Sequence, residues 1–155
     1  LDYFLNYIFC INFIHIMQVS LITCTNNSEQ TIKYCCQSIF SQTYHNIEHI
    51  ILDNNSQDKT VSIINNYKRK NLKIYQQKGF GIYNALNEAM KVSNGNIIGI
   101  LHSDDEFIDK DVVSIITQKF LENDLDVLFS NIYYTKKNDV NKIIRKWKSN
   151  LNEGI

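Results

Sequence analysis

Two short acidic clusters are the residues of this sequence best suited to chemistry. Asp104 and Asp105 directly follow an apolar stretch in GILHSDD, and Asp53 ends another apolar stretch at the start of DNNSQDKT. Adjacent carboxylates repel each other unless a cation offsets their charge. Mg²⁺ and Mn²⁺ prefer oxygen ligands and are often held by one or two carboxylates together with substrate phosphates. The Asp-Asp pair therefore predicts a divalent-metal site, with a solvated loop as the alternative.

Asp53 is a candidate for recognising a nucleoside. A carboxylate at the end of a strand can accept hydrogen bonds from a ribose hydroxyl or from a base N–H. The alternative is an Asx-turn, with Ser56 or Asp58 capping the next helix, and the two roles are compatible. The sequence contains no G-x-x-x-x-G-K-[ST], which excludes a P-loop, and no G-x-G-x-x-G after the first strand, which argues against a dehydrogenase-type dinucleotide fold.

The elements that must position these residues alternate between strand and helix from Met17 onward. Apolar and β-branched runs predict strands at 18–24, 47–52, 72–75, 96–101 and 126–130. Helical spacing of apolar residues predicts helices at 28–40, 61–67, 82–92 and 109–122, with Ser28 and Asp109 as caps. Residues 132–148 are expected to form a hairpin that turns at 137–139.

This alternation predicts an α/β fold with a mostly parallel, Rossmann-like sheet, flanking helices and a C-terminal hairpin. In such open sheets, ligands bind outside the carboxyl ends of the strands. Three polar clusters fall there, at residues 23–27, 53–58 and 103–105. Their convergence is a stronger signal of a binding site than any one cluster.

Composition limits the classes of function. The chain has 155 residues, enough for one domain, and 16 basic residues balance 16 acidic ones. Neutrality argues against a general binder of nucleic acid or anionic membranes, but it leaves room for a local patch. The absence of proline and the five glycines exclude collagen-like and linker-like chains. We expect reduced, packing cysteines, because no pair has C-x-x-C spacing: Cys10, Cys24, Cys35 and Cys36.

Residues 1–16 (LDYFLNYIFCINFIHI) form an apolar, aromatic extension that polar residues interrupt. It is too short and polar for a clear membrane span, and it lacks the basic start and cleavage site of a secretory signal. We favour a native start at Met17, because a well-formed strand follows directly. A weak membrane anchor is the alternative.

The motifs, in their order and spacing, resemble family 2 glycosyltransferases, whose catalytic domain has the GT-A fold. The resemblance rests on four segments between about Met17 and Asn150: VSLITCTNNSEQTI, SIFSQTYHNIEHIILDNNSQDKT, GFGIYNALNEAMKVSNGNIIGILHSDDEF and IRKWKSN. The last is similar to a stretch of a bacterial subgroup that builds surface polysaccharide. The sequence departs from the family at Asn26, where an aromatic residue is common, and at Gly79 and Asn84, where acidic residues are frequent.

The resemblance implies transfer of a sugar, with inversion, from a UDP- or GDP-sugar donor to a glycan or lipid-linked acceptor, with Mg²⁺ or Mn²⁺ as cofactor. It implies a metal ligand at Asp105 and donor-nucleotide contacts at Thr23, Thr25, Asn27, Asp53, Lys78 and Asp104. It also implies a cytoplasmic location, with peripheral association at the inner face of the membrane, and no nucleic-acid partner. Residues 17–155 would form the nucleotide-sugar-binding domain without the acceptor-binding part.

The catalytic base is not assigned. An inverting enzyme needs a base to take the proton of the acceptor hydroxyl. In the family this carboxylate follows later in the chain, and Glu153 lies in the wrong context for that role. The missing base keeps a second hypothesis open, a non-catalytic nucleotide-sugar-binding fragment. A nucleotidyltransferase is less favoured, because the loop after the first strand lacks a glycine-rich basic sequence, and so is a flavodoxin-like or receiver domain.

Overall fold

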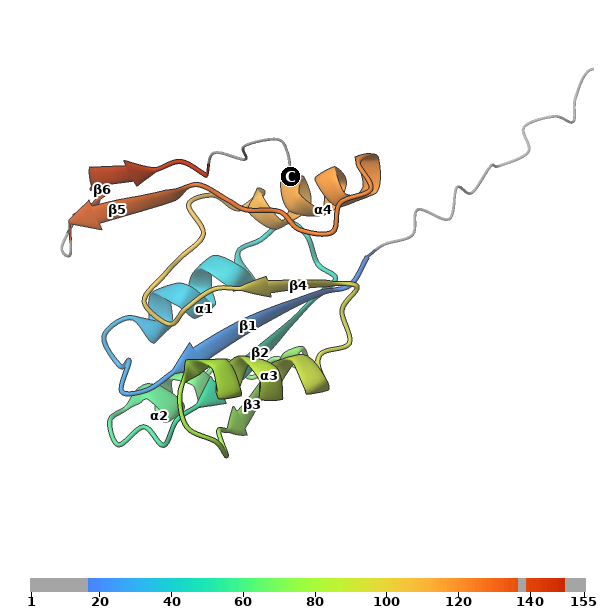
Figure 1. Cartoon of the computed structure of the whole chain (residues 1–155). Coiled ribbons are helices and arrows are strands. Elements are labelled where there is room, and N and C mark those ends of the chain that lie inside the picture. Colours follow the sequence, from blue (N-terminus) through green and yellow to red (C-terminus); the bar gives the residue numbers. More distant parts are fainter. Residues whose placement is uncertain (1–16, 137–138, 150–155) are drawn as a thin grey trace, which may run out of the picture. The chain divides into compact units, whose positions relative to one another are not determined.

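The computed structural model describes residues 17–136 and 139–149 (Figure 1). The expectations for residues 1–16, for residues 137–138 of the hairpin turn predicted at 137–139, and for Glu153 lie outside this part. The chain divides after Thr117 into two units, and each is described by itself.

The first unit is built on a parallel sheet of four strands in the order β3-β2-β1-β4. The strands are β1 (Val19–Thr25), β2 (Ile47–Asp53), β3 (Leu72–Gln76) and β4 (Ile97–Ile100). All seven residues of β2 and six of the seven in β1 are buried, as expected for central strands covered on both faces. The expectation of a mostly parallel α/β sheet is confirmed.

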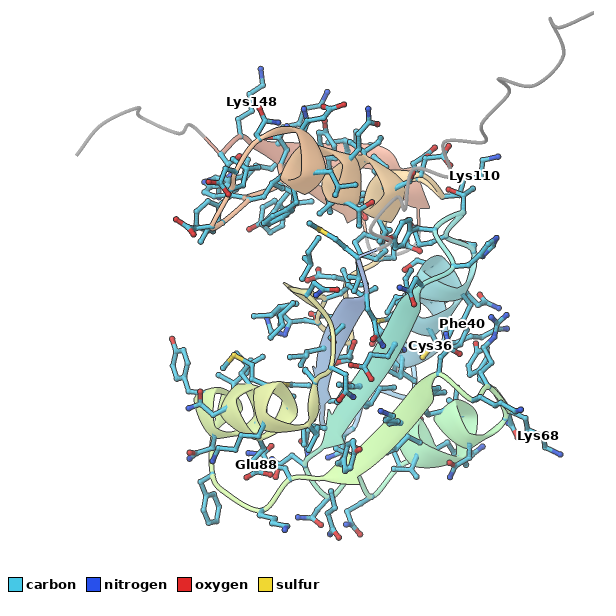
Figure 2. The ribbon with its side chains drawn as sticks, turned by 90° about the vertical axis from the view of Figure 1, so that its right-hand side faces the viewer. Cys36, Phe40, Lys68, Glu88, Lys110 and Lys148 are labelled. Atoms are coloured by element: carbon cyan, nitrogen blue, oxygen red, sulfur yellow. The ribbon has the colours of Figure 1, made fainter. Side chains whose placement is uncertain are left out.

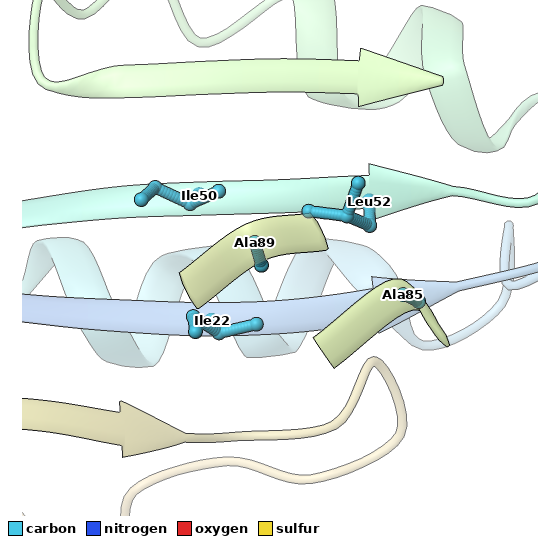
Figure 3. Close-up of a cluster of buried hydrophobic side chains, with 5 residues drawn as sticks. All are labelled: Ile22, Ile50, Leu52, Ala85 and Ala89. Carbon is cyan, nitrogen blue, oxygen red and sulfur yellow. The ribbon is translucent and has the colours of Figure 1, made fainter. Parts of the chain in front are cut away.

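Helices cover both faces of this sheet, because successive side chains of a strand point to opposite faces. On one face, Ala85 and Ala89 of α3 (Ile82–Val92) pack against Ile22, Ile50 and Leu52 (Figure 3). The small alanines let the helix approach the larger strand side chains closely. On the other face, α1 (Ile32–Phe40) brings the buried Cys35 to the hydroxyl of Thr23, with α2 (Thr60–Asn65) beside it.

The start of α1 corrects one prediction. The helix begins at Ile32 rather than at Ser28, and its N-cap residue Thr31 makes no side-chain cap. The Ser28 hydroxyl instead contacts the Ser103 hydroxyl at 2.9 Å and donates to the Asn26 carbonyl. A tertiary partner that is distant in sequence has therefore replaced the expected local cap.

A buried polar cluster lies at the amino ends of the strands, near the start of β4. The Glu48 carboxylate accepts hydrogen bonds from the Ser20 hydroxyl (2.7 Å), the Asn94 amide (2.6 Å) and the Lys73 ammonium (3.0 Å). Burial alone would raise the pKa of Glu48, but these donors hold it at about 2. The Gly95 amide donates to Ser20, and a β-carbon at Gly95 would lie 2.5 Å from the Ser20 nitrogen.

The second unit contains an antiparallel hairpin of β5 (Ile132–Lys136) and β6 (Asp139–Trp147), which confirms the predicted hairpin. The strand predicted at 126–130 is wrong, because that segment joins no sheet in the described part of the chain. These residues favour an extended backbone, but they form a strand only when a partner strand pairs with them. The last helix, α4 (Val112–Glu122), begins in the first unit and ends in the second.

Two further features bear on function. Across residues 17–136 and 139–149, no helix is long and apolar enough to cross a membrane. Cys24, Cys35 and Cys36 are free thiols, and burial raises the pKa of Cys35 to about 12. A thiol that stays protonated fits the expected packing role.

Candidate functional site

The polar loops after β1 and β2 meet at the carboxyl edge of the sheet. Thr25 pairs with Asp53 in the parallel register, and the Asn54 amide donates to the Thr25 carbonyl. Four more backbone amides cross between the loops to side-chain oxygens: Asn27 N to Ser56 Oγ, Gln57 N to Asn27 Oδ1, Glu29 N to Asp58 Oδ2, and Lys59 N to Glu29 Oε2. This loop–loop network sets the backbone of both predicted nucleotide loops.

Asn27 has a structural role inside this network. Its φ of 49° lies in the left-handed region, which asparagine tolerates better than most residues. The conformation lets its amide and its side-chain oxygen both reach the β2–α2 loop. A contact between Asn27 and a donor nucleotide stays a prediction.

Asp53 bonds to Ser56, three residues on, and not to the residue two positions on as in the Asx-turn that was one of the two interpretations of its motif. One carboxylate oxygen accepts the Ser56 amide at 3.0 Å, and the other accepts the Ser56 hydroxyl at 2.5 Å. Asp58 does the corresponding work for the next helix by accepting the amide and hydroxyl of Thr60. Each carboxylate oxygen has further lone pairs, so the turn leaves acceptor capacity on Asp53 for a ligand.

The two threonines of β1 have different surroundings. Thr23 is fully buried, and its hydroxyl donates to the Leu101 carbonyl at 2.8 Å and lies 2.9 Å from His49 Nε2. Thr25, which is 4% exposed, has a hydroxyl without a hydrogen-bond partner in the described part of the chain. Buried hydroxyls are almost always satisfied, so Thr25 is the better placed of the two to receive a ligand group.

The pairing at Thr23 also determines the state of His49. Burial lowers the pKa of His49 to about 3, so the ring is neutral. Because the Thr23 proton goes to Leu101, His49 Nε2 supplies the proton of the second bond, and its Nδ1 has no partner within the described residues. His49 and Thr23 thereby tie β2 and β1 to the residue that precedes the acidic loop.

The Asp104–Asp105 pair follows β4 and is held next to the first loop. The Leu101 amide donates to the Ile22 carbonyl, and Ser103, buried in this loop, contacts Ser28. Both aspartates are exposed. Burial of part of its carboxyl group, and then the charge of Asp104, raise the pKa of Asp105.

These carboxylates fit a divalent cation in part. A cation would stabilise the charged form of Asp105, whose pKa is raised first by burial and then by the charge of Asp104, and carboxylate oxygens are suitable ligands for Mg²⁺ or Mn²⁺. No group of three or more metal-ligating side chains exists within the described residues. The donor set therefore matches an ion that receives its remaining ligands from substrate phosphates and water.

The loop before α3 holds the remaining predicted residue, Lys78. The Glu88 carboxylate accepts the amides of Lys78 (3.1 Å) and Gly79 (2.9 Å), and these bonds lower the pKa of Glu88. The buried Gln77 side chain donates to the carbonyls of Gly79 and Gly81. Gly81 has a φ of +82°, which explains why glycine precedes the helix.

Sequence reasoning missed the residues that shape the site from behind: His49, Gln77 and Glu88. A signal existed for His49, because a polar residue inside an otherwise apolar strand needs a partner. Gln77 and Glu88 had no local signal, since their partners lie in a loop whose path only the fold determines.

The family assignment follows from comparison with known proteins. A family model described as "Glycosyl transferase family 2" matches residues 20–154, which is most of the chain. The chain belongs to this family. The enzyme class expected from the sequence is therefore confirmed at the level of a glycosyltransferase family.

Curated relatives agree with this assignment. WfaP of Escherichia coli, a UDP-Glc:alpha-D-GlcNAc-diphosphoundecaprenol beta-1,3-glucosyltransferase, is 34% identical over 123 residues, which are 79% of this chain and 48% of WfaP. The glycosyltransferase GlyG of Streptococcus pneumoniae serotype 4 is 28% identical over 126 residues, 79% of this chain and 42% of GlyG. The chain spans less than half the length of these relatives.

Solved structures confirm the GT-A fold. Residues 1–349 of TarS from S. aureus superpose with a TM-score of 0.64 at 30% identity, over 68% of this chain and 33% of TarS 1–349. The same protein in complex with UDP-GlcNAc gives a TM-score of 0.61 at 26% identity, over 77% of this chain and 40% of the other. The mannosyltransferase PcManGT from Pyrobaculum calidifontis, solved with GDP-Man and Mn²⁺, shares the fold at 20% identity, over 80% of this chain and 37% of its own, with a TM-score of 0.63.

Proposed function

We propose that this chain binds the donor of a metal-dependent, inverting glycosyltransferase that moves a sugar from a UDP- or GDP-sugar to a glycan or lipid-linked acceptor. The observation that supports this most directly is the contact between Ser28 and Ser103. It joins the two nucleotide loops to the acidic loop, so a nucleoside at one and a diphosphate at the other can belong to one donor.

Each residue has a separate task in this proposal. Thr25 offers its unpartnered hydroxyl and Asp53 its remaining acceptor capacity to the nucleoside. Asp104 accepts from the ribose, and Asp105 is the metal ligand. The metal supplies Lewis-acid stabilisation of the charge that develops on the leaving diphosphate. Lys78 lies on a loop whose backbone Glu88 holds, and its ammonium contacts the diphosphate.

Thr23 and Asn27 support this donor site through their backbone positions as well as their side chains. The fully buried Thr23 hydroxyl already bonds to the Leu101 carbonyl, so we propose that Thr23 supports donor binding by holding Leu101 and the acidic loop in place. The activity itself also needs a base for the acceptor hydroxyl, and we assign that role to no described residue. The proposal therefore concerns donor binding by this chain and transfer by the whole protein.

A non-catalytic donor-binding module is the second candidate, because no described residue is assigned as the base. The two candidates differ in turnover only. Donor binding without release of nucleotide diphosphate, in the presence of a mixture of glycan and lipid-linked acceptors, would favour the module.

Isothermal titration with UDP and GDP, each with and without Mn²⁺, tests donor binding. We expect binding that strengthens on adding Mn²⁺, and loss of that metal effect in Asp105→Asn. Asp124→Asn is the matched control, because it removes the same charge from an exposed position of the second unit. A folded sample without metal-dependent binding of either nucleotide would contradict the proposal.

A further inference from the structure

Two hydrogen bonds cross the interior of the sheet behind the acidic loop. His49 Nε2 of β2 lies 2.9 Å from the Thr23 hydroxyl of β1, and this hydroxyl donates to the Leu101 carbonyl at 2.8 Å. We call this pair of bonds the Thr23 bridge. The side chains of His49 and Thr23 are fully buried, so solvent does not reach the bridge.

The direction of the bridge follows from the protons available to it. A hydroxyl has one proton to donate, and a carbonyl oxygen can only accept. His49 must therefore donate to Thr23 from Nε2, which leaves Nδ1 of the neutral ring without a proton. An acceptor at position 49 would compete with Leu101 for the Thr23 proton. A donor there directs this proton to the residue from which the acidic loop begins.

Histidine is a costly residue for this position. Its Nδ1 has no partner within the described residues, and a buried acceptor without a hydrogen bond lowers stability. The Phe40 ring of α1, which is labelled in Figure 2, packs edge-on against the His49 ring with centroids 6.0 Å apart, and Arg69 covers Phe40 at 4.3 Å. An apolar side chain would make such packing contacts without an unpaired nitrogen. The donated bond to Thr23 is what an apolar side chain could not supply.

The far end of the bridge is the backbone of the acidic loop. Leu101 is held through both backbone groups, since its amide donates to the Ile22 carbonyl at 3.0 Å and its carbonyl accepts from Thr23. The loop then turns tightly, because the Asp105 amide donates to the His102 carbonyl at 3.1 Å. A change at Leu101 is therefore passed to Asp105 through a few residues of constrained backbone.

The acidic pair also lies within electrostatic reach of the bridge. Cys35 Sγ lies 3.8 Å from the Thr23 hydroxyl. Burial raises the pKa of Cys35 to about 12, and the charges of Asp105 and Asp104 contribute to that rise. The bridge and the acidic pair are thus connected through the backbone and are also close in space.

We propose that His49 is a positioning residue for the acidic loop, acting through the Thr23 hydroxyl and the Leu101 carbonyl. It thereby orients Asp105, the metal ligand of the proposed donor site, on which this inference rests. Removing an outer partner of a metal ligand commonly weakens metal binding by about ten- to a hundredfold. Because His49 acts through a second side chain and a short stretch of backbone, we expect the lower end, about tenfold.

His49→Gln and His49→Asn form a matched pair of variants. Both place an amide in the same buried site, but the Gln nitrogen is as many bonds from Cβ as Nε2 is, and the Asn nitrogen only as many as Nδ1. Gln can therefore donate to Thr23, and Asn falls short of it. The electron paramagnetic resonance signal of free Mn²⁺ measures Mn²⁺ affinity at saturating UDP. We expect His49→Asn to weaken Mn²⁺ binding about tenfold and His49→Gln to keep the affinity of the original chain.

His49→Leu separates positioning from stability. It removes the donor but also the unpaired Nδ1, so the two effects on stability oppose each other and the urea midpoint should change little. Mn²⁺ binding should nevertheless weaken as in His49→Asn. Ile64→Ala is the control, because Ile64 is fully buried in α2 and lies outside the bridge. It should lower the urea midpoint and leave Mn²⁺ affinity unchanged.

Equal Mn²⁺ affinity in the Gln and Asn variants would overturn the proposal. So would a loss of Mn²⁺ affinity that follows the loss of stability across all four variants, because His49 would then have a purely structural role. UDP binding without metal should be the same in the Gln and Asn variants, since neither changes a residue proposed to contact the nucleoside.

Hydrogen exchange tests the positioning role separately from the donor site. The Asp105 amide, which donates to the His102 carbonyl, should exchange faster in His49→Asn than in His49→Gln. Equal exchange in the two variants would refute positioning by His49, whatever the metal result. An original chain without metal-dependent UDP binding would refute the proposed donor site, and faster exchange in His49→Asn alone would still support the role of His49 in holding the loop.

Discussion

Replacing Thr23 by valine removes one hydroxyl from the interior without changing the shape of the side chain. The hydroxyl joins the Leu101 carbonyl at 2.8 Å and His49 Nε2 at 2.9 Å, and the side chain is fully buried. The change therefore leaves one acceptor and one donor without their partner. Each unsatisfied buried group costs about 1 to 3 kcal/mol, so the free energy of unfolding should fall by about 2 to 6 kcal/mol.

Thr23→Ser is the matched control, because it keeps the hydroxyl and loses only a methyl group. It should cost about 1 kcal/mol. Urea unfolding followed by circular dichroism measures both variants, and equal slopes against urea would show that the unfolded states are comparable. A double-mutant cycle with His49→Leu should give a coupling energy, since the two side chains share one hydrogen bond.

The outcome separates two roles for Thr23. If valine and serine variants agree within about 0.5 kcal/mol, the hydrogen bonds do not hold the fold as argued. If the valine variant keeps its stability but loses UDP binding, the direct nucleotide contact implied by the family resemblance is correct instead. We expect instead that the valine variant loses stability, and that weaker binding of UDP and Mn²⁺ is only a consequence of the same lost hydrogen bonds.

Three further predictions concern the surrounding framework. Glu48→Gln should lower the free energy of unfolding at neutral pH by at most about 3 kcal/mol, because the folded pKa of about 2 lies below the unfolded value of 4.5. Urea titrations at a series of pH values should show this difference in unfolding free energy from the original chain disappearing as pH falls from about 4.5 to 2. Gly95→Ala should cost about 2 to 3 kcal/mol because the new β-carbon meets backbone, whereas Gly99→Ala meets only a leucine methyl and should cost less in the same assay. Glu88→Ala should speed hydrogen exchange of the two loop amides that it accepts, with Lys91→Ala as the control that leaves them protected.

Much of the framework was predictable from local patterns. Helix α3 has the expected bounds, and the strands β1 to β4 lie within two residues of their predicted positions. These elements follow from the periodicity of apolar residues, which acts over a few neighbours. The hairpin was predictable for the same reason. The strand expected at 126–130 was not, because strand formation depends on a partner that the local pattern does not supply.

The exposure of the aromatic side chains in the hairpin also could not be predicted from the local sequence pattern. Aromatic rings are usually buried, which favours core packing for Tyr133, Tyr134 and Trp147 over stacking on a sugar. In the described hairpin all three are between 39% and 51% exposed, with Arg145 over Tyr134 and Lys146 over Tyr133. Aromatic content alone indicates neither which face of a hairpin is covered nor by what.

The sequence by itself determined which residues could do chemistry and that they follow parallel strands. Carboxylates after Leu52 and Ser103 and hydroxyls at the end of β1 are visible in the printed chain, as is their order. Tertiary structure decided how these residues are used. Thr23 and Thr25 share a strand end and a residue type, yet one hydroxyl is satisfied by Leu101 and His49 and the other has no partner within the described residues. The difference depends on the His49 side chain of β2 and on the Leu101 carbonyl just after β4, because hydrogen bonding is decided by atoms within about 3 Å and not by distance along the chain.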